Sequence, residues 1–214
     1  MNKIALIPVI EILYPAEVKE AEGAAPNGSW QAEPESWDAY LRRLNRRMGF
    51  SDLRSFPLGS RRYPVADLTQ TDVALAIDLH LGDTPLQESC GLFGGLVLME
   101  GATPILIPQC CGMLADITFW EALTRPEAFA EPFCLEGHPC PQAISDSVEV
   151  EIQCIEDREP FEMPAPLSYR VSRQSLCDAL EEAKRVLNSF AAKVEIWGRE
   201  RGYPEAADVL VYEK

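Results

Sequence analysis

The stretch from Cys90 to Trp120 constrains the fold more than any other part of the chain. It contains two apolar runs, Phe93–Met99 and Thr103–Ile107, separated by three residues. Two such runs around a short turn predict an antiparallel hairpin. After the Pro-Gln-Cys-Cys-Gly turn at 108–112, Asp116 is placed to cap an amphipathic helix that ends near Pro126. A hairpin that leads directly into a helix predicts that strands and helices share one core.

Four further segments are predicted to be strands because they are apolar runs or alternate between apolar and polar residues. They are Lys3–Leu13, Asp72–Leu81, Ser147–Glu156 and Asp208–Tyr212. The alternation is strict in Asp72–Leu81, which would place Asp78 and His80 on the same face of that strand. Gly94 and Gly95 inside the hairpin predict a bulge or a close approach by another backbone.

Two segments have the apolar spacing of long helices. The first begins at Ser36, ends at Gly49 and carries arginines on its polar face. We expect these arginines and their neighbours to pair with carboxylates of the same chain or of a second copy, namely Arg42, Arg43, Arg46, Arg47, Arg54, Arg61 and Arg62. The second helix is capped by Ser172 and continues to Gly202, long enough to span a domain or to form a homodimer with a second copy.

Together these elements predict one α+β domain over residues 1–214. Its core would be a mixed or mostly antiparallel sheet of about six strands, covered by the two long helices. Residues 16–33 have no regular apolar period and are rich in Ala, Glu, Gly and Pro, so they are expected to form a surface loop.

The charge of the chain restricts its partners. With 34 acidic and 19 basic side chains, the formal net charge is −15. Nucleic acid and anionic membranes are therefore not expected as partners, because both attract basic surfaces. No apolar run approaches the roughly 18 residues of a membrane span, and Lys3 alone is a poor start for a signal peptide. The expected location is the cytoplasm.

Acidic residues concentrate between Glu127 and Glu162, where Arg158 is the one basic residue. Some of them alternate with apolar residues in the predicted strand Ser147–Glu156, which would collect them on one surface. We predict that this surface binds a basic protein, although acidity can also serve solubility alone. The predicted partner-binding residues are Glu127, Glu131, Glu136, Asp146, Glu149, Glu151, Glu156, Asp157 and Glu159, with Glu162 at the end of the stretch.

The seven cysteines are odd in number and irregularly spaced, which indicates mostly reduced thiols. The simplest interpretation of Cys110 and Cys111 is two small side chains packed in a tight turn. The alternatives are a thiol-dependent enzyme, with Cys111 activated by His80 or His138, and a zinc site. The zinc ligands would come from Cys110, Cys111, Cys134, His138 and Cys140. Asp78 and His80 are a further candidate dyad or metal pair. No motif for a cofactor is present, and none is expected.

One part of the chain carries a resemblance. Gly94-Gly95-Leu96-Val97-Leu98, Pro108-Gln109-Cys110-Cys111-Gly112, Asp116 and Trp120 resemble a pattern of uncharacterised bacterial proteins. More distantly, this core is similar to immunity proteins of the SUKH superfamily. That resemblance implies an acidic α+β protein that is not an enzyme and that neutralises a toxin by covering it. It covers residues 94–120 and leaves the long C-terminal helix outside.

Overall fold

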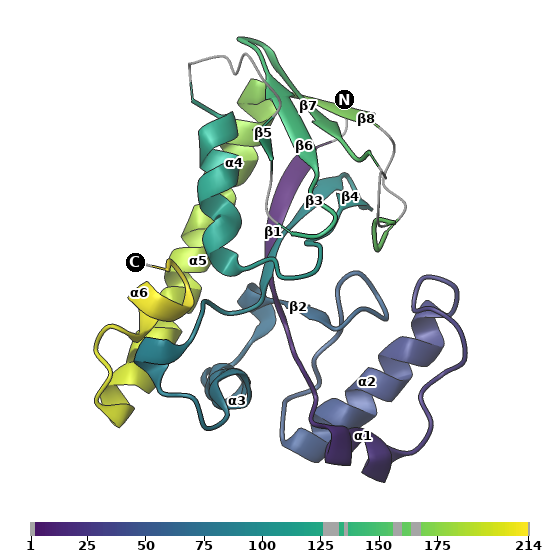
Figure 1. The fold of residues 1–214 in the computed structure, drawn as a ribbon, viewed down its shortest axis with the longest axis vertical. Coiled ribbons are helices and arrows are strands. Elements are labelled where there is room, and N and C mark those ends of the chain that lie inside the picture. The colour runs from purple at the N-terminus through teal and green to yellow at the C-terminus, as the bar shows by residue number, and fades with distance from the viewer. Residues whose placement is uncertain (1–2, 126–132, 135–136, 156–159, 164–167, 214) are drawn as a thin grey trace. The chain divides into compact units, whose positions relative to one another are not determined.

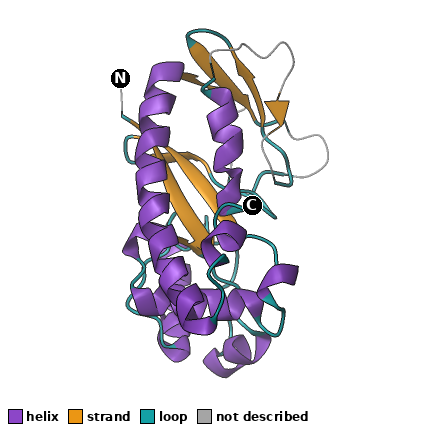
Figure 2. Cartoon of the chain, turned by 90° about the vertical axis from the view of Figure 1, so that its left-hand side faces the viewer, coloured by secondary structure: helices purple, strands orange, loops and turns teal. Residues whose placement is uncertain are grey.

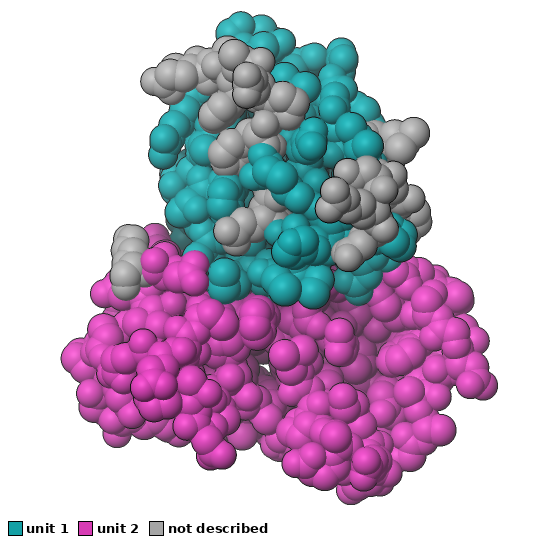
Figure 3. Space-filling model, viewed as in Figure 1, with its two compact units in different colours: residues 1–8, 94–187 teal, residues 9–93, 188–214 magenta. Residues whose placement is uncertain are grey.

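A computed structural model describes residues 3–125, 133–134, 137–155, 160–163 and 168–213. The chain forms two compact units, unit 1 from residues 1–8 and 94–187 and unit 2 from residues 9–93 and 188–214 (Figure 3). Both units contain helices and strands, as the predicted α+β class requires. Strand β1 (Ile4–Glu11) and helix α5 (Arg173–Arg201) each continue from one unit into the other, and the single domain predicted for residues 1–214 stays a prediction.

Unit 1 contains the predicted hairpin. Strand β3 (Gly94–Glu100) pairs antiparallel with β4 (Thr103–Leu106), and the register shifts between Leu98 and Met99. On its other side β3 lies next to β1 in the sheet. Just beyond the ends of these two strands, the Gly101 amide donates to the Lys3 carbonyl at 2.8 Å. The close approach expected at the glycines is confirmed, because the Gly94 amide donates to the Gly112 carbonyl at 2.8 Å. The Cys-Cys-Gly turn therefore packs directly on the start of β3.

The helix expected after this turn is present as α4 (Ile117–Leu123), which follows a short 3-10 turn, η3 (Leu114–Asp116). The Asp116 carboxylate accepts from the Met113 amide at 2.8 Å, so it caps the 3-10 turn. Trp120 and Leu123 are buried on the inner side of α4. The predicted succession of hairpin, turn and helix is thus confirmed, and α4 begins directly after Asp116 as expected. The predicted capping of this helix by Asp116 is wrong, because the Asp116 side chain makes no capping hydrogen bond to α4.

Unit 1 also contains a second antiparallel sheet with strand order β5-β6-β7-β8 (Figure 1). Its strands are β5 (Phe133–Cys134), β6 (Gln142–Ser145), β7 (Glu149–Gln153) and β8 (Ser168–Ser172). One face is buried through Ala143, Val150, Ile152 and Val171. The described strands therefore form two sheets of four strands, and the prediction of one sheet of about six strands is wrong.

Helix α5 is the long helix predicted from Ser172 onward, and it is visible along its length in Figure 2. The Ser172 hydroxyl accepts from the Ser175 amide at 3.1 Å, which confirms the cap. Its apolar stripe is buried at every predicted position, namely Leu176, Leu180, Ala183, Leu187, Phe190, Val194 and Trp197. None of the described helices is long and apolar enough to cross a membrane.

Unit 2 is mainly helical. It contains α1 (Ala16–Glu22), α2 (Pro34–Met48), β2 (Arg62–Pro64), η1 (Val65–Asp67), α3 (Gln70–Leu81), η2 (Leu86–Glu88) and α6 (Ala206–Leu210). Strand β2 pairs antiparallel with the last residues of β1. The predicted helix from Ser36 is α2, which begins earlier because Pro34 can occupy the first helical turn.

Four of the seven arginines predicted to pair, Arg42, Arg43, Arg47 and Arg61, form ion pairs within the chain, which is one of the two alternatives predicted. Arg42 holds Asp52 at 2.8 Å, and Arg61 holds Glu11 at 2.9 Å. Glu22 of α1 accepts from Arg43 at 2.6 Å and from Arg47 at 3.2 Å. The charges of these four arginines are therefore neutralised by carboxylates of the same chain.

Three other predictions in unit 2 are wrong. Residues 72–81 form helix α3, because Thr69 and Asp72 make a reciprocal capping box that starts a helix there. Residues 208–212 belong mostly to the short helix α6, where Ala206, Ala207 and Leu210 are buried at helical spacing. The predicted loop at 16–33 contains α1, which has no buried residue and is joined to α2 by the Glu22 ion pairs.

Candidate functional site

The predicted acidic strand is β7. Its polar side chains lie on one face of the second sheet, because successive side chains of a strand point to opposite faces. In the β6–β7 register Ile144 lies opposite Glu151, and in the β7–β8 register Glu151 lies opposite Arg170. Because side chains alternate along a strand, Glu149 lies on this same face. We call Ile144, Glu149, Glu151 and Arg170 the outer sheet face, and we include in it Asp146 and Val148 of the adjoining turn, because Val148 is exposed directly beside Glu149 in the chain.

Glu151 is held by three neighbours on this face. Its carboxylate accepts from Ser168 Oγ at 2.7 Å, from Gln153 Nε2 at 3.0 Å and from Arg170 Nε at 2.9 Å. These interactions, with the Gln153 hydrogen bond first, lower the pKa of Glu151. Glu151 is therefore a fixed anion whose charge is shared with Arg170.

Asp146 shapes the turn between β6 and β7. Its Oδ1 accepts from the amides of Glu149 and Val148, both at 2.7 Å. These two hydrogen bonds stabilise the ionised carboxylate and lower the pKa of Asp146. Its first role is consequently to fix the turn that presents Glu149.

Glu149 differs from the other two acids. Its side chain is exposed and makes no hydrogen bond or ion pair with the residues that the structure describes. Large apolar side chains are exposed around it, with Val148 at 66% and Ile144 at 36% of full exposure. The outer sheet face therefore combines an unpaired anion with uncovered apolar surface.

The remaining predicted acidic residues are placed less clearly. Glu162 is exposed, and its amide donates to the buried Gln109 Oε1 at 3.0 Å. The rest lie outside the described residues, namely Glu127, Glu131, Glu136, Glu156, Asp157 and Glu159. Ile144 and Arg170 were not predicted as part of the surface, because they come from β6 and β8 and meet Glu151 only through strand pairing. Val148 was not predicted there either, and it lies in the turn before β7.

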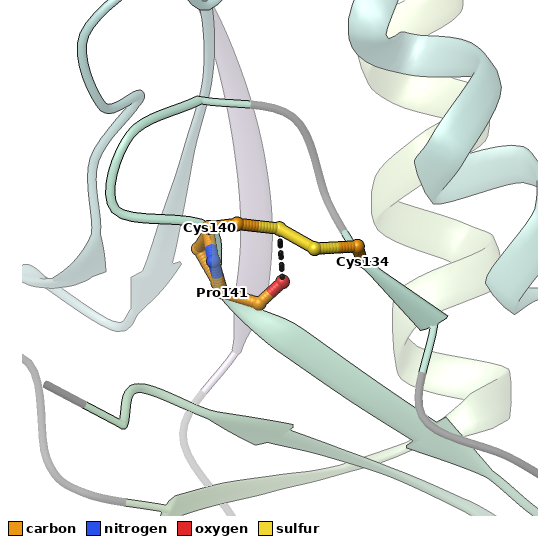
Figure 4. Close-up of a disulfide and its surroundings, with 3 residues drawn as sticks. All are labelled: Cys134, Cys140 and Pro141. Atoms are coloured by element: carbon orange, nitrogen blue, oxygen red, sulfur yellow. Dashed lines mark hydrogen bonds between the residues drawn. A yellow bond between two sulfur atoms is a disulfide. The ribbon is translucent and has the colours of Figure 1, made fainter. Parts of the chain in front are cut away.

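The cysteines predicted as an alternative site do lie together in unit 1. Cys110 and Cys111 are exposed and outside any disulfide, and their Sγ atoms are 3.4 Å apart. The His138 amide donates to the Cys110 carbonyl at 3.0 Å and forms an isolated antiparallel bridge. Cys134 and Cys140 on either side of His138 are joined by a disulfide (Figure 4).

This arrangement bears on the zinc alternative. Two of the five predicted ligands, Cys134 and Cys140, share a disulfide and so lack the thiolate that binds zinc. Within the described ranges no three His, Cys, Asp or Glu side chains are grouped so that they could hold a metal ion. The cluster as it stands is a dithiol beside a disulfide.

Asp78 and His80, the predicted dyad or metal pair, have different partners in the structure. His80 Nε2 lies 3.0 Å from the Cys90 carbonyl and 3.3 Å from Ser89 Oγ, and its ring packs edge-on against Phe93. Asp78 accepts instead from Trp197 Nε1 at 3.0 Å. Residues two apart on a helix point in different directions, so Asp78 and His80 do not form the predicted pair.

Cys154 directly follows β7 and is the buried thiol among the described cysteines outside a disulfide. It is 4% exposed, and burial raises its pKa to about 11. Such a thiol is almost wholly protonated at neutral pH and is a poor nucleophile.

Comparison with protein-family models, with curated proteins and with solved structures found no match.

Proposed function

We propose that this is a non-enzymatic bacterial interaction protein that binds a basic protein partner through the outer sheet face. The partner class that fits best is a basic toxin domain, which makes the chain an immunity protein acting in the cytoplasm. The observation that carries the proposal is Glu149, exposed and unpaired among the described residues, next to exposed Ile144 and Val148.

Solubility alone accounts less well for this face. A surface that serves only solubility needs charge and has no use for two exposed branched aliphatic side chains beside it. Protein interfaces, in contrast, join apolar contacts to charged groups at their rim. Ile144 and Val148 supply the apolar part, and Glu149 supplies the charge.

The size of the face sets a limit on its role. Three strands about 4.8 Å apart, each of about five residues, cover roughly 250 Å². A stable interface buries about 800 Å² on each partner. The outer sheet face is thus the centre of a larger contact, and we propose that the acidic residues on either side of β7 extend it.

Charge adds speed and selectivity to such a contact. The net charge of −15 attracts a basic partner over a distance set by the ionic strength, about 8 Å at physiological salt. Association should therefore slow as salt is added, whereas the apolar part of the contact should be little affected.

Glu149→Lys tests the proposal. We expect at least tenfold weaker binding of the toxin domain encoded beside the gene, equivalent to about 1.4 kcal/mol, measured by calorimetry at physiological salt. Glu17→Lys is the matched control, because Glu17 is exposed on α1 and the substitution changes the net charge equally. Equal affinities for Glu149→Lys and Glu17→Lys would contradict the assignment of the surface.

Glu151 should be changed more gently. A lysine at this position would face Arg170 directly across the strands and would destabilise the sheet whatever the partner. Glu151→Gln keeps the shape and removes one charge. We expect it to weaken binding less than Glu149→Lys does, because the Glu151 charge is already shared with Arg170.

The predicted homodimer through α5 stays a prediction. The apolar stripe of α5 is buried within the chain, and Ile196 is the one large apolar side chain of this helix that is exposed in the described structure. A dimer contact through α5 would therefore have to use mostly charged residues.

A further inference from the structure

Two elements of unit 1 bring four cysteines together. The turn at Cys110 and Cys111 and the loop from Cys134 to Cys140 are joined by the backbone bridge between Cys110 and His138. The contact is tight, because a Cβ atom added at Gly137 would lie 2.9 Å from Gln109 Cβ. Cys110 and Cys111, which lie outside a disulfide, and Cys134 are exposed, so these sulfur atoms are at the surface of unit 1.

We propose that these four cysteines form one dithiol–disulfide exchange unit, an activity separate from the proposed partner binding. The Cys110–Cys111 pair supplies the dithiol, and Cys134–Cys140 supplies the disulfide. Cys140 is two residues from His138, whose backbone bridge holds Cys110, whereas Cys134 is four residues from His138, so we propose Cys140 as the sulfur that is attacked.

The exchange is balanced within the chain. The Cys110 thiolate attacks Cys140 Sγ, the Cys110–Cys140 bond forms, and Cys134 leaves as a thiolate. The Cys111 thiolate then attacks Cys110 Sγ and releases the Cys140 thiolate. Two electrons pass from the vicinal pair to the loop, and the two protons given up by Cys110 and Cys111 end on Cys134 and Cys140. No external oxidant is needed.

The Cα–Cα distances also indicate which of the two disulfides, Cys134–Cys140 or Cys110–Cys111, is the major form. The Cα atoms of Cys134 and Cys140 are 6.1 Å apart, inside the usual range for a disulfide. Neighbouring Cα atoms joined by a trans peptide are about 3.8 Å apart, outside that range. The vicinal disulfide is therefore the minor form, and removal of Cys111 should stop the exchange at the mixed Cys110–Cys140 disulfide.

Other cysteines of the chain are not suited to this exchange. Cys154 is buried with a raised pKa, and Cys177 is half-buried within α5. Cys90 is exposed but belongs to unit 2, so Cys90→Ser provides a matched control that removes an exposed thiol elsewhere.

The test uses Cys111→Ser in the full chain, equilibrated in graded glutathione redox buffers, quenched with acid, alkylated and mapped by mass spectrometry. We expect a Cys110–Cys140 crosslink with alkylated Cys134 at intermediate buffers, at least tenfold above the level in wild type and in Cys90→Ser. A Cys134–Cys140 disulfide as the sole bond at every buffer would overturn the proposal.

A second variant guards against misfolding. Cys111 has a φ of 67°, a conformation that glycine adopts without strain, so Cys111→Gly fits the turn. It should trap the same crosslink. Cys110→Ser should abolish it, because this change removes the attacking sulfur. A crosslink to Cys140 that persists without Cys110 would also overturn the assignment.

Discussion

At the scale of single residues, Asp72 shows how one carboxylate decides the structure of a segment. Its Oδ2 accepts from the Thr69 amide at 2.9 Å and from Ser51 Oγ at 2.8 Å, and its Oδ1 accepts from the Ser51 amide at 2.8 Å. Burial acts to raise the pKa of Asp72, but these hydrogen bonds outweigh it and the pKa is lowered. The ionised side chain therefore stabilises the start of α3.

The lowered pKa gives a prediction for stability against pH. A carboxyl with a lower pKa in the folded state stabilises fully above its unfolded value of about 3.9 and loses this contribution as pH falls through the folded value. Asp72→Asn should cost about 1–3 kcal/mol at pH 7, because the amide cannot accept from all these donors. The difference from wild type should shrink below about pH 4.

Urea unfolding at several pH values measures this effect. Asp83→Asn is the control, since Asp83 is exposed in the turn after α3 and should show little change at any pH. A deficit for Asp72→Asn that is the same at neutral and at acid pH would show that the carboxylate charge is not what stabilises the cap.

At the scale of elements, Gly198 shows a close approach inside α5. A Cβ atom there would lie 2.3 Å from the Tyr203 carbonyl oxygen and 2.6 Å from Ala206 Cβ. Alanine is the better helix former by about 1 kcal/mol, but overpacking against backbone costs about 1–3 kcal/mol. We expect the cost of the clash to exceed the gain in helix propensity, so that an alanine at this position lowers the free energy of unfolding.

Gly198→Ala should therefore destabilise the protein by about 1–2 kcal/mol in urea unfolding. Ser189→Ala on the exposed side of α5 is the control, and it should be neutral or slightly stabilising. A more stable Gly198→Ala would mean that α6 can move away from α5 at little cost.

The helices α2, α4 and α5 and the hairpin β3–β4 could be predicted from sequence, because their apolar periods and end residues agree. Residues 72–81 could not be assigned by alternation alone, since Val73, Ala76 and Ile77 also fit one helix face. The signal that separates the two is the spacing of Thr69 and Asp72. Strands β5, β6 and β8 are short, and their pairing depends on partners far along the chain.

The candidate site, too, could be predicted only in part from the sequence. The exposed position of Glu149 follows from alternation along one strand, and it was predicted. The pairing of Glu151 with Arg170 was not, because Arg170 comes from β8, 19 residues away. The side-chain contacts that decide which acid is unpaired arise between strands and are not visible in the order of residues.

At the scale of the whole molecule, carboxylates that pair with arginines differ in role from a carboxylate that has no such partner. Among the arginines on and near α2, Arg42, Arg43 and Arg61 pair with Asp52, Glu22 and Glu11 within unit 2. Glu149 on the outer sheet face has no such partner in the described structure. We therefore propose that a basic partner contacts this face, and that the paired arginines have an internal role.

Hydroxyl-radical footprinting of the complex with the proposed basic toxin domain is the most direct test of the outer sheet face as the partner-binding surface. Ile144 and Ile196 are equally exposed at 36% and 38%, and Val148 and Leu13 form a second pair at 66% and 49%. We predict that complex formation lowers the labelling of Ile144 and Val148 several-fold and leaves Ile196 and Leu13 unchanged. Protection of Ile196 or Leu13, with Ile144 and Val148 still labelled at the free rate, would contradict it.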